Sequence, residues 1–300
     1  MMTQAEREAA YERIVRELAV DRMGTEPDAP PLPPWAGTPS PRAGSTLPIE
    51  AEIAGVQMIE YGEFWARPGL DLRTRSFITL AALQATRGMY KQLYRHVNIA
   101  LNLGITPNEI HETFLQAGCY CGLPAVENAA DVATAVFVHR GILAPGDGAT
   151  VEPKAQMDHQ DRRAAMARVA AALGVNRVGL GPDAPPLVPL PGPLAQISST
   201  RGEVEGDLAM IGAQYGYGEL WGRAGLDLRT RSFITMAVLQ VVVENDQLHI
   251  HVNNALNLGI PADEIHEAIA HVGMYGGVSG SHNAGNVAKD VLRQWGLAAK

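Results

Sequence analysis

The sequence predicts an all-α protein made of two tandem copies of one helical domain. Residues 69–79 (GLDLRTRSFIT) recur unchanged as residues 225–235, and matching stretches lie about 155 residues apart throughout the chain. Hydrophobic residues recur at helical spacing between glycines and prolines, and no segment sustains the period-two alternation of a strand. We therefore divide the chain into two domains, residues 1–150 and 151–300, each with an N-terminal helix and a proline-rich strap.

The N-terminal third of each copy is expected to combine helices with an extended segment. Residues 4–20 form an amphipathic helix, because Ala10, Ile14 and Leu18 share one face. Residues 27–48 contain eight prolines, which exclude both a helix and a central strand and favour an extended strap. Residues 52–65 return to a helical pattern.

The next helices are defined by their caps. Asp71 is expected to cap a helix that runs through Arg87, and capping with buried ion pairing explains most charged residues of the repeated block. Residues 93–101 belong to a further helix, which Gly104 ends.

The last two helices of each copy follow a clear start signal. Thr106-Pro-Asn-Glu109 combines a capping box with proline at the first helical position, whereas Pro261 replaces the threonine in the second copy and requires another cap. Gly118 and Gly122 are expected to interrupt this helix, and residues 128–140 to form the last one.

Composition excludes several classes of protein. The chain is 46% hydrophobic and 19% charged and contains no apolar run long enough to cross a bilayer. Its net charge of -8 argues against nucleic-acid binding, which needs a basic face. The N-terminus is charged and helical rather than a signal peptide, and Cys119 and Cys121 are the only cysteines. We therefore expect no disulfide scaffold and a cytoplasmic location.

Four motifs occur in the same order in both copies. In the first copy they are residues 63–75 (EFWARPGLDLRTR), His96-x3-Ala-Leu-Asn-x-Gly104, Glu109-Ile-x-Glu112 and Tyr120-x-Gly-x-Pro-Ala-x-x-Asn128. In the second they are residues 219–231 (ELWGRAGLDLRTR), His251-x3-Ala-Leu-Asn-x-Gly259, Glu264-Ile-x-Glu267 and Tyr275-x-Gly-x-Ser-Gly-x-x-Asn283. As a set, these motifs resemble the carboxymuconolactone decarboxylase family, within the superfamily of alkyl hydroperoxidase D-like proteins.

The resemblance implies small helical subunits that associate as hexamers around a site without a cofactor. Two fused copies then imply a homo-oligomer, most simply a trimer of pseudo-hexameric shape. Decarboxylating an unsaturated lactone requires the site to desolvate a carboxylate, stabilise charge on a carbonyl oxygen and deliver a proton to carbon. An imidazole and a carboxyl group suit that proton transfer, because burial moves both pKa values toward neutrality.

The candidate catalytic residues follow from this chemistry. His96 and His251 border an apolar helix face, for which a core or interface histidine is the alternative. Glu267 and His271 are four residues apart and share one helix face, so they form either a catalytic pair or an exposed ion pair. The first copy lacks this pair, because Gln116 replaces His271 there. The candidates are His96, His251, Glu112, Glu267, His271 and His282.

The candidate substrate-binding residues lie around the last motif, where the copies differ most. The tyrosine hydroxyls are candidate hydrogen-bond donors, with ring packing as the alternative. The residues are Tyr120, Tyr275, Glu127, Asn128 and Asn283. Because Glu127 stands where the second copy has His282, we expect two non-equivalent pockets, the second of which, with Glu267, His271 and His282, is better equipped for proton transfer.

Thiol and metal chemistry are disfavoured. Cys119 and Cys121 are two residues apart, so on a helix their side chains diverge, unlike a C-x-x-C redox pair. His249 and His251 diverge in the same way, and no cluster of ligands joins them, so no metal is expected.

These observations predict a cofactor-independent enzyme that decarboxylates, or isomerises by proton transfer, a small carboxylated lactone or cyclic enone. A specialised-metabolism enzyme for isomerisation, ring opening or condensation is one alternative. A non-catalytic ligand-binding and oligomerisation module is the other.

Overall fold

The protein is all-α, as expected. The structure, a computed structural model, describes residues 2–35, 48–144, 157–190 and 210–297. In these ranges extended pairing is limited to two isolated bridges, Arg22 with Pro31 and Arg177 with Pro186. The bridges occupy matching places in the two copies, where each begins its proline-rich segment. Residues 36–47, most of the expected strap, lie outside the described residues.

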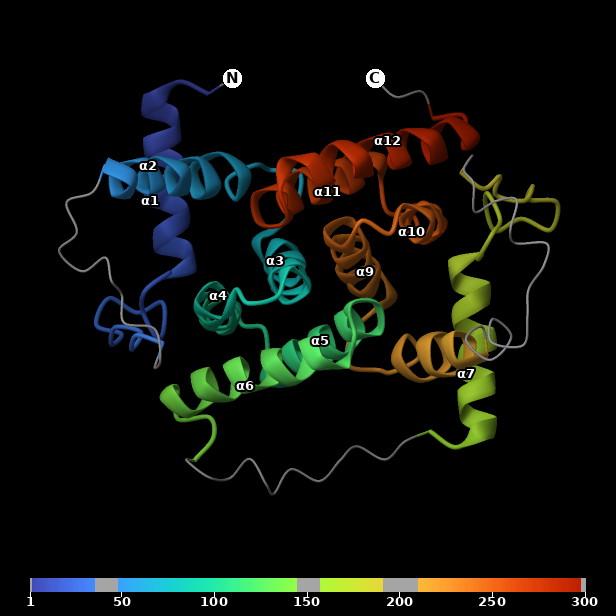
Figure 1. The fold of residues 1–300 in the computed structure, drawn as a ribbon, viewed down its shortest axis with the longest axis horizontal. Coiled ribbons are helices and arrows are strands. Elements are labelled where there is room, and N and C mark those ends of the chain that lie inside the picture. Colours follow the sequence, from blue (N-terminus) through green and yellow to red (C-terminus); the bar gives the residue numbers. More distant parts are fainter. Residues whose placement is uncertain (1, 36–47, 145–156, 191–209, 298–300) are drawn as a thin grey trace.

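The two copies repeat one series of elements (Figure 1). The first copy contains α1 (Gln4–Leu18), α2 (Pro48–Ile59), the π-helical turn η1 (Glu60–Phe64), α3 (Leu72–Thr86), α4 (Tyr90–Asn102), α5 (Pro107–Cys121) and α6 (Leu123–His139). The second contains α7 (His159–Leu173), the π-helical η4 (Gly212–Leu220), α9 (Leu228–Val242), α10 (Asn245–Asn257), α11 (Ala262–Gly276) and α12 (Val278–Gln294).

The expected caps are confirmed. The Asp71 side chain accepts a hydrogen bond from the Thr74 amide at the start of α3. Thr106 and Glu109 form the reciprocal capping box of α5, whereas α11 begins after Pro261 without a side-chain cap. The helix starts were therefore readable from local sequence, because a cap needs only neighbouring residues.

Two helix boundaries differ from the prediction. Gly118 does not interrupt α5, which continues to Cys121. Its hydrogen side chain instead lets α6 approach, because a Cβ at this position would collide with Val126. The last helix also begins earlier than expected, at Leu123 rather than at residue 128. Neither π-helical segment was expected.

The two copies are interleaved rather than side by side. α3 and α9 pack against each other at the centre of the molecule, α11 packs on α3, and α5 packs on α9 (Figure 1). Residues 75–85 of α3 are all buried, as is typical of a central helix covered on every side. One hydrophobic core consequently runs through both copies.

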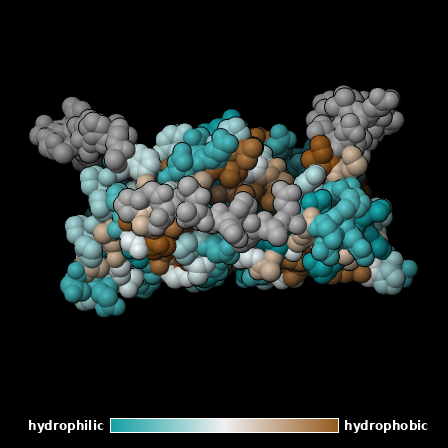
Figure 2. All heavy atoms as spheres, turned by 90° about the horizontal axis from the view of Figure 1, so that it is seen from below, coloured by the Kyte–Doolittle hydropathy of each residue, from teal (hydrophilic) through white to brown (hydrophobic). Residues whose placement is uncertain are grey.

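The described surface mixes polar and apolar residues. On the face seen in Figure 2, hydrophobic residues form several patches separated by hydrophilic ones. None of the described helices combines the length and the apolar character that spanning a bilayer requires.

Candidate active site

Interleaving creates two composite sites, each built from both copies. In the first, η1, Trp65 and α4 of the first copy face α11 of the second. In the second, η4, Trp221 and α10 face α5 of the first copy. π-Helical turns occur often at functional sites, because the extra residue re-aims the side chains around it. Here they carry one wall of each site.

His96 lies at the centre of the first site. Its ring stacks on Trp65, with centroids 5.9 Å apart and planes 16° apart, and meets the edge of Tyr275 at 5.5 Å. The Trp65 indole N–H donates to the Tyr275 hydroxyl over 2.7 Å, and this hydroxyl donates to Glu60 over 2.7 Å. The Glu60 Oε1 atom is 4.0 Å from His96 Nε2, too far for a direct hydrogen bond.

Burial sets the protonation states of these two groups. Desolvation lowers the pKa of His96 to about 3, with the charge of Arg95 acting in the same direction. Desolvation raises the pKa of Glu60, although the Tyr275 hydrogen bond and Arg95 oppose it. A neutral imidazole therefore faces a carboxyl group that holds its proton to a higher pH than an exposed glutamate does.

A cavity of about 620 Å³ opens onto this pair. Leu83 and Met274 contribute apolar walls, one from each copy. Lys91 and Arg95, one helical turn apart on α4, line the same cavity, where Lys91 adds positive charge and Arg95 also pairs with Asp21 over 3.3 Å. The arrangement suits a small organic acid whose reacting part lies against Glu60 and His96.

The predicted pair Glu267 and His271 belongs to this first site, not to a separate pocket of the second copy. Glu267 accepts hydrogen bonds from Arg67 and, at 2.9 Å, from Arg75. Burial alone raises the pKa of Glu267, but the hydrogen bonds from both arginines outweigh it and leave the pKa lowered. The carboxylate is therefore an ion-pair partner rather than a proton donor.

His271 contacts two first-copy side chains. Its Nδ1 is 3.3 Å from an Arg75 guanidinium nitrogen, and its Nε2 is 2.9 Å from Thr79 Oγ1. Because a guanidinium only donates, Nδ1 accepts and Nε2–H donates to Thr79. Burial is the main reason that the pKa of His271 lies well below its usual range, and the charge of Arg75 lowers the pKa further. We read His271 as a neutral positioning residue.

The second site repeats this frame around His251. Trp221 stacks on the ring at 5.6 Å and donates to the Tyr120 hydroxyl over 2.9 Å. Tyr120 lies 3.3 Å from His251 Nε2, and burial lowers the pKa of His251 to about 3. Gln116 takes the place of His271, accepting from an arginine and donating to Thr235 over 3.1 Å.

Three substitutions between the copies distinguish the sites. Gly216 occupies the position of Glu60, so the second site lacks that carboxyl group. Asp246 and Ile250 stand where the first site has Lys91 and Arg95. The first site, which also contains Glu267 and His271, is consequently the one with the additional carboxyl group and the cations, whereas Glu267 and His271 were expected in a pocket of the second copy.

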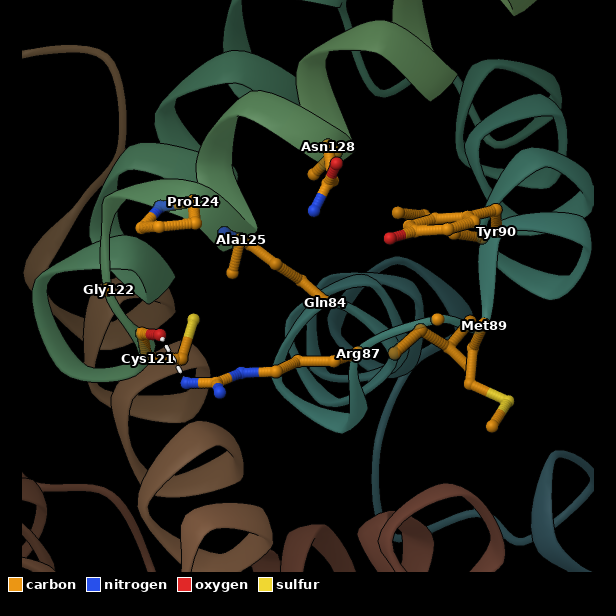
Figure 3. A pocket seen from close by; sticks show the side chains of 13 residues that line it. Gln84, Arg87, Met89, Tyr90, Cys121, Gly122, Pro124, Ala125 and Asn128 are labelled. Carbon is orange, nitrogen blue, oxygen red and sulfur yellow. Dashed lines mark hydrogen bonds between the residues drawn. The ribbon is translucent and has the colours of Figure 1, made fainter.

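The remaining predicted residues lie elsewhere. Glu112 is buried and paired with Arg223 and Arg231, as the second site's equivalent of Glu267. His282 is exposed on α12 and lines a different cavity of about 310 Å³. Glu127, Asn128 and Asn283 are exposed on α6 and α12, and Asn128 lines a separate cavity beside the end of α3 (Figure 3).

Sequence reasoning missed Glu60, Lys91 and Arg95. The shared motifs do not include these three residues, which also lie outside the divergent stretch after Gly122. A signal for the missed residues did exist, because each charged side chain is replaced by an opposite, neutral or absent one in the other copy. What could not be read was that Glu60 lies next to Tyr275, 215 residues along the chain.

The cysteines do not form a reactive pair. Cys119 is exposed and Cys121 is buried, and burial raises the pKa of the Cys121 thiol to about 11. That thiol is therefore protonated at neutral pH, when a nucleophile needs the thiolate. Among the residues that the structure describes, no group of three or more His, Cys, Asp or Glu side chains is arranged to hold a metal ion.

The fold and its sites define a class: an interleaved tandem α-helical protein with a stacked histidine in each of two composite sites. The carboxymuconolactone decarboxylase family model matches residues 54–135 and 211–290, which together make up more than half of the chain. The chain therefore belongs to the carboxymuconolactone decarboxylase family, as a tandem member.

Curated relatives match over one copy's length. The chain is 36% identical over 86 residues to a 4-carboxymuconolactone decarboxylase of Acinetobacter baylyi, covering 29% of this chain and 64% of that protein. It is 40% identical over 65 residues to a nitrosuccinic acid decarboxylase of Metarhizium robertsii, covering 22% of this chain and 45% of that protein. An uncharacterized 15.0 kDa protein of Paracoccus denitrificans is 36% identical over 78 residues, covering 26% and 58%. Each match thus spans less than two thirds of the relative.

Proposed function

We propose that the chain is a cofactor-independent lyase that removes CO2 from a small carboxylated lactone or cyclic enone in the His96 cavity. One observation carries the proposal: a buried neutral imidazole, a carboxyl group of raised pKa and two cations meet at one cavity. The names of two relatives agree with it, since both describe loss of a carboxyl group from a small acid.

Binding uses the charges at the cavity. Arg95 and Lys91 hold a carboxylate that the substrate keeps, which fixes its orientation. The leaving carboxylate faces the apolar wall that includes Leu83 and Met274, where it loses hydration and becomes less stable relative to CO2.

The reaction then needs one bond cleavage and one proton transfer. The carbon–carbon bond to the leaving carboxylate breaks, CO2 departs, and the electron pair moves through the conjugated ring to the carbonyl oxygen. His96, with its proton on Nε2, donates a hydrogen bond to this oxygen. The pair returns to carbon, which takes the Glu60 proton, and Glu60 recovers a proton from water. Overall, one carboxylate is replaced by hydrogen.

The test is CO2 release from 4-carboxymuconolactone by single variants. Glu60→Gln keeps a partner for Tyr275 but removes the proton, so we expect the rate to fall roughly 10²–10⁴-fold. His96→Asn should lower the rate about 10²–10³-fold, through loss of oxyanion stabilisation.

His251→Asn is the matched control, because His251 occupies the equivalent position in the site that lacks Glu60. We expect it to retain CO2 release. The proposal fails if His251→Asn abolishes release while His96→Asn and Glu60→Gln leave it unchanged.

A proton-transfer isomerase would use the same Glu60 and His96. Substrate consumption without CO2, still dependent on Glu60, would support that activity in place of decarboxylation. A ligand-binding module without catalysis gains support if ligands bind but both histidine variants behave as the wild type in every turnover assay.

A further inference from the structure

A second cavity lies beside the catalytic one and contains polar groups that the proposed reaction does not use. Its volume is about 300 Å³, and it lies between the end of α3, the start of α4 and the start of α6 (Figure 3). Leu83 and Met89 line both cavities and form the wall between them. We propose that this cavity binds a small organic acid that carries both a carboxylate and a hydroxyl group, independently of the proposed decarboxylation.

Arg87 supplies the charge for a carboxylate. One guanidinium nitrogen donates to the Cys121 carbonyl over 3.2 Å, which lays the side chain along the cavity (Figure 3). Asn128 from α6 and Tyr90 from α4 point toward the cavity centre from different helices (Figure 3). The charged and neutral donors thus converge on one space.

Gln84 supplies an acceptor for a hydroxyl group. Its side chain is 3% exposed, and its amide nitrogen donates to the Phe114 carbonyl over 3.1 Å. Among the described residues, none forms a hydrogen bond with its buried Oε1 atom. Buried acceptors are almost always satisfied, so a ligand hydroxyl that donates here would meet that requirement.

The backbone at Arg87 decides which substitution can test the proposal. Arg87 adopts φ 58° and ψ 144°, a combination that favours glycine. Val243, the matching residue of the second copy, has a φ of 61°, so a positive φ at this helix end is shared by both copies and glycine suits it in each. The corresponding position of the second copy is Val243, which has no charge, so only the first copy carries this guanidinium.

The probe is trans-4-hydroxycyclohexanecarboxylate, which joins a carboxylate, an apolar ring and a hydroxyl group. Isothermal titration should detect one such site per chain. The carboxamide analogue, which lacks the charge, and cyclohexanecarboxylate, which lacks the hydroxyl, should each bind more weakly. We expect Arg87→Gly to lower the affinity for the probe about tenfold or more, because the substitution removes a charged hydrogen-bond donor.

Arg87→Gly separates binding from folding, because glycine adopts the strained backbone freely and the thermal midpoint should hold or rise. Val243→Gly makes the same exchange in the second copy and should leave binding unchanged. Arg95→Ile removes a cation of the catalytic cavity and should also leave it unchanged. The proposal is overturned if binding survives Arg87→Gly, or if Arg95→Ile abolishes it, which would place the probe in the catalytic cavity.

Discussion

At the scale of single residues, burial is the largest influence on the pKa values of the two stacked histidines and of Glu60. His96 and His251 are both buried under a tryptophan, and desolvation is the largest cause of their low pKa values. The same effect acts oppositely on Glu60, because its charged form is the deprotonated one. Burial thus keeps the imidazole neutral and lets Glu60 hold its proton to a higher pH than an exposed glutamate does.

These pKa shifts predict loss of stability in acid. The pKa of His251 falls from 6.5 to about 3 on folding, so below pH 6.5 the unfolded chain binds a proton that the folded chain does not. The contribution of His251 to the free energy of unfolding is fully present above pH 6.5 and is lost as the pH falls toward 3. The loss approaches about 1.4 kcal/mol per pH unit for each such histidine. Urea unfolding between pH 7.5 and 5.5 measures this slope. His251→Asn should make the dependence of the unfolding free energy on pH less steep, by the contribution of one histidine. An unchanged slope would show that burial of neutral His251 does not contribute to it.

At the scale of elements, the repeated block around α3 and α9 serves contact between the copies. Gly69 lies where a Cβ would collide with Glu267, and Gly225 lies in the same relation to Glu112. Arg75 at the start of α3 pairs with Glu267 from α11. The block recurs unchanged because each copy must present the same surface to the other.

Exchange of equivalent residues between α11 and α5 tests the positioning role. Gln116 accepts from an arginine and donates to a threonine, as His271 does, so His271→Gln should preserve CO2 release and stability. His271→Leu leaves Arg75 and Thr79 without this partner and should cost about 1–3 kcal/mol of unfolding free energy in urea titrations. Near-complete inactivity of a folded His271→Gln chain would instead identify a proton-transfer role.

At the scale of the whole molecule, duplication produces function by interleaving. The wall of each site comes from one copy and its supporting network from the other. The duplication also lets the two sites differ, since Glu60 and Gly216 are encoded separately. The trimer that the family resemblance implies stays a prediction, which a solution mass of three chains would bear out.

Separating the copies should therefore abolish activity. Residues 1–150 expressed alone lack Tyr275 and expose the face of α3 that packs on α9 and α11. We expect neither half to release CO2 from 4-carboxymuconolactone, and co-expression of both halves to restore it. Full activity of residues 1–150 by themselves would show that the first copy holds a complete site.

The duplication, most helices and their caps can be predicted from local sequence. Asp71 and the Thr106 capping box act on neighbouring backbone groups, and helical periodicity is also local, so both were legible without a structure. Which residues meet in a site depends on contacts between distant parts of the chain. Packing of α11 against α3 and η1 brings Tyr275 to Glu60 and His271 to Trp65, and no local pattern specifies contacts between residues about two hundred positions apart.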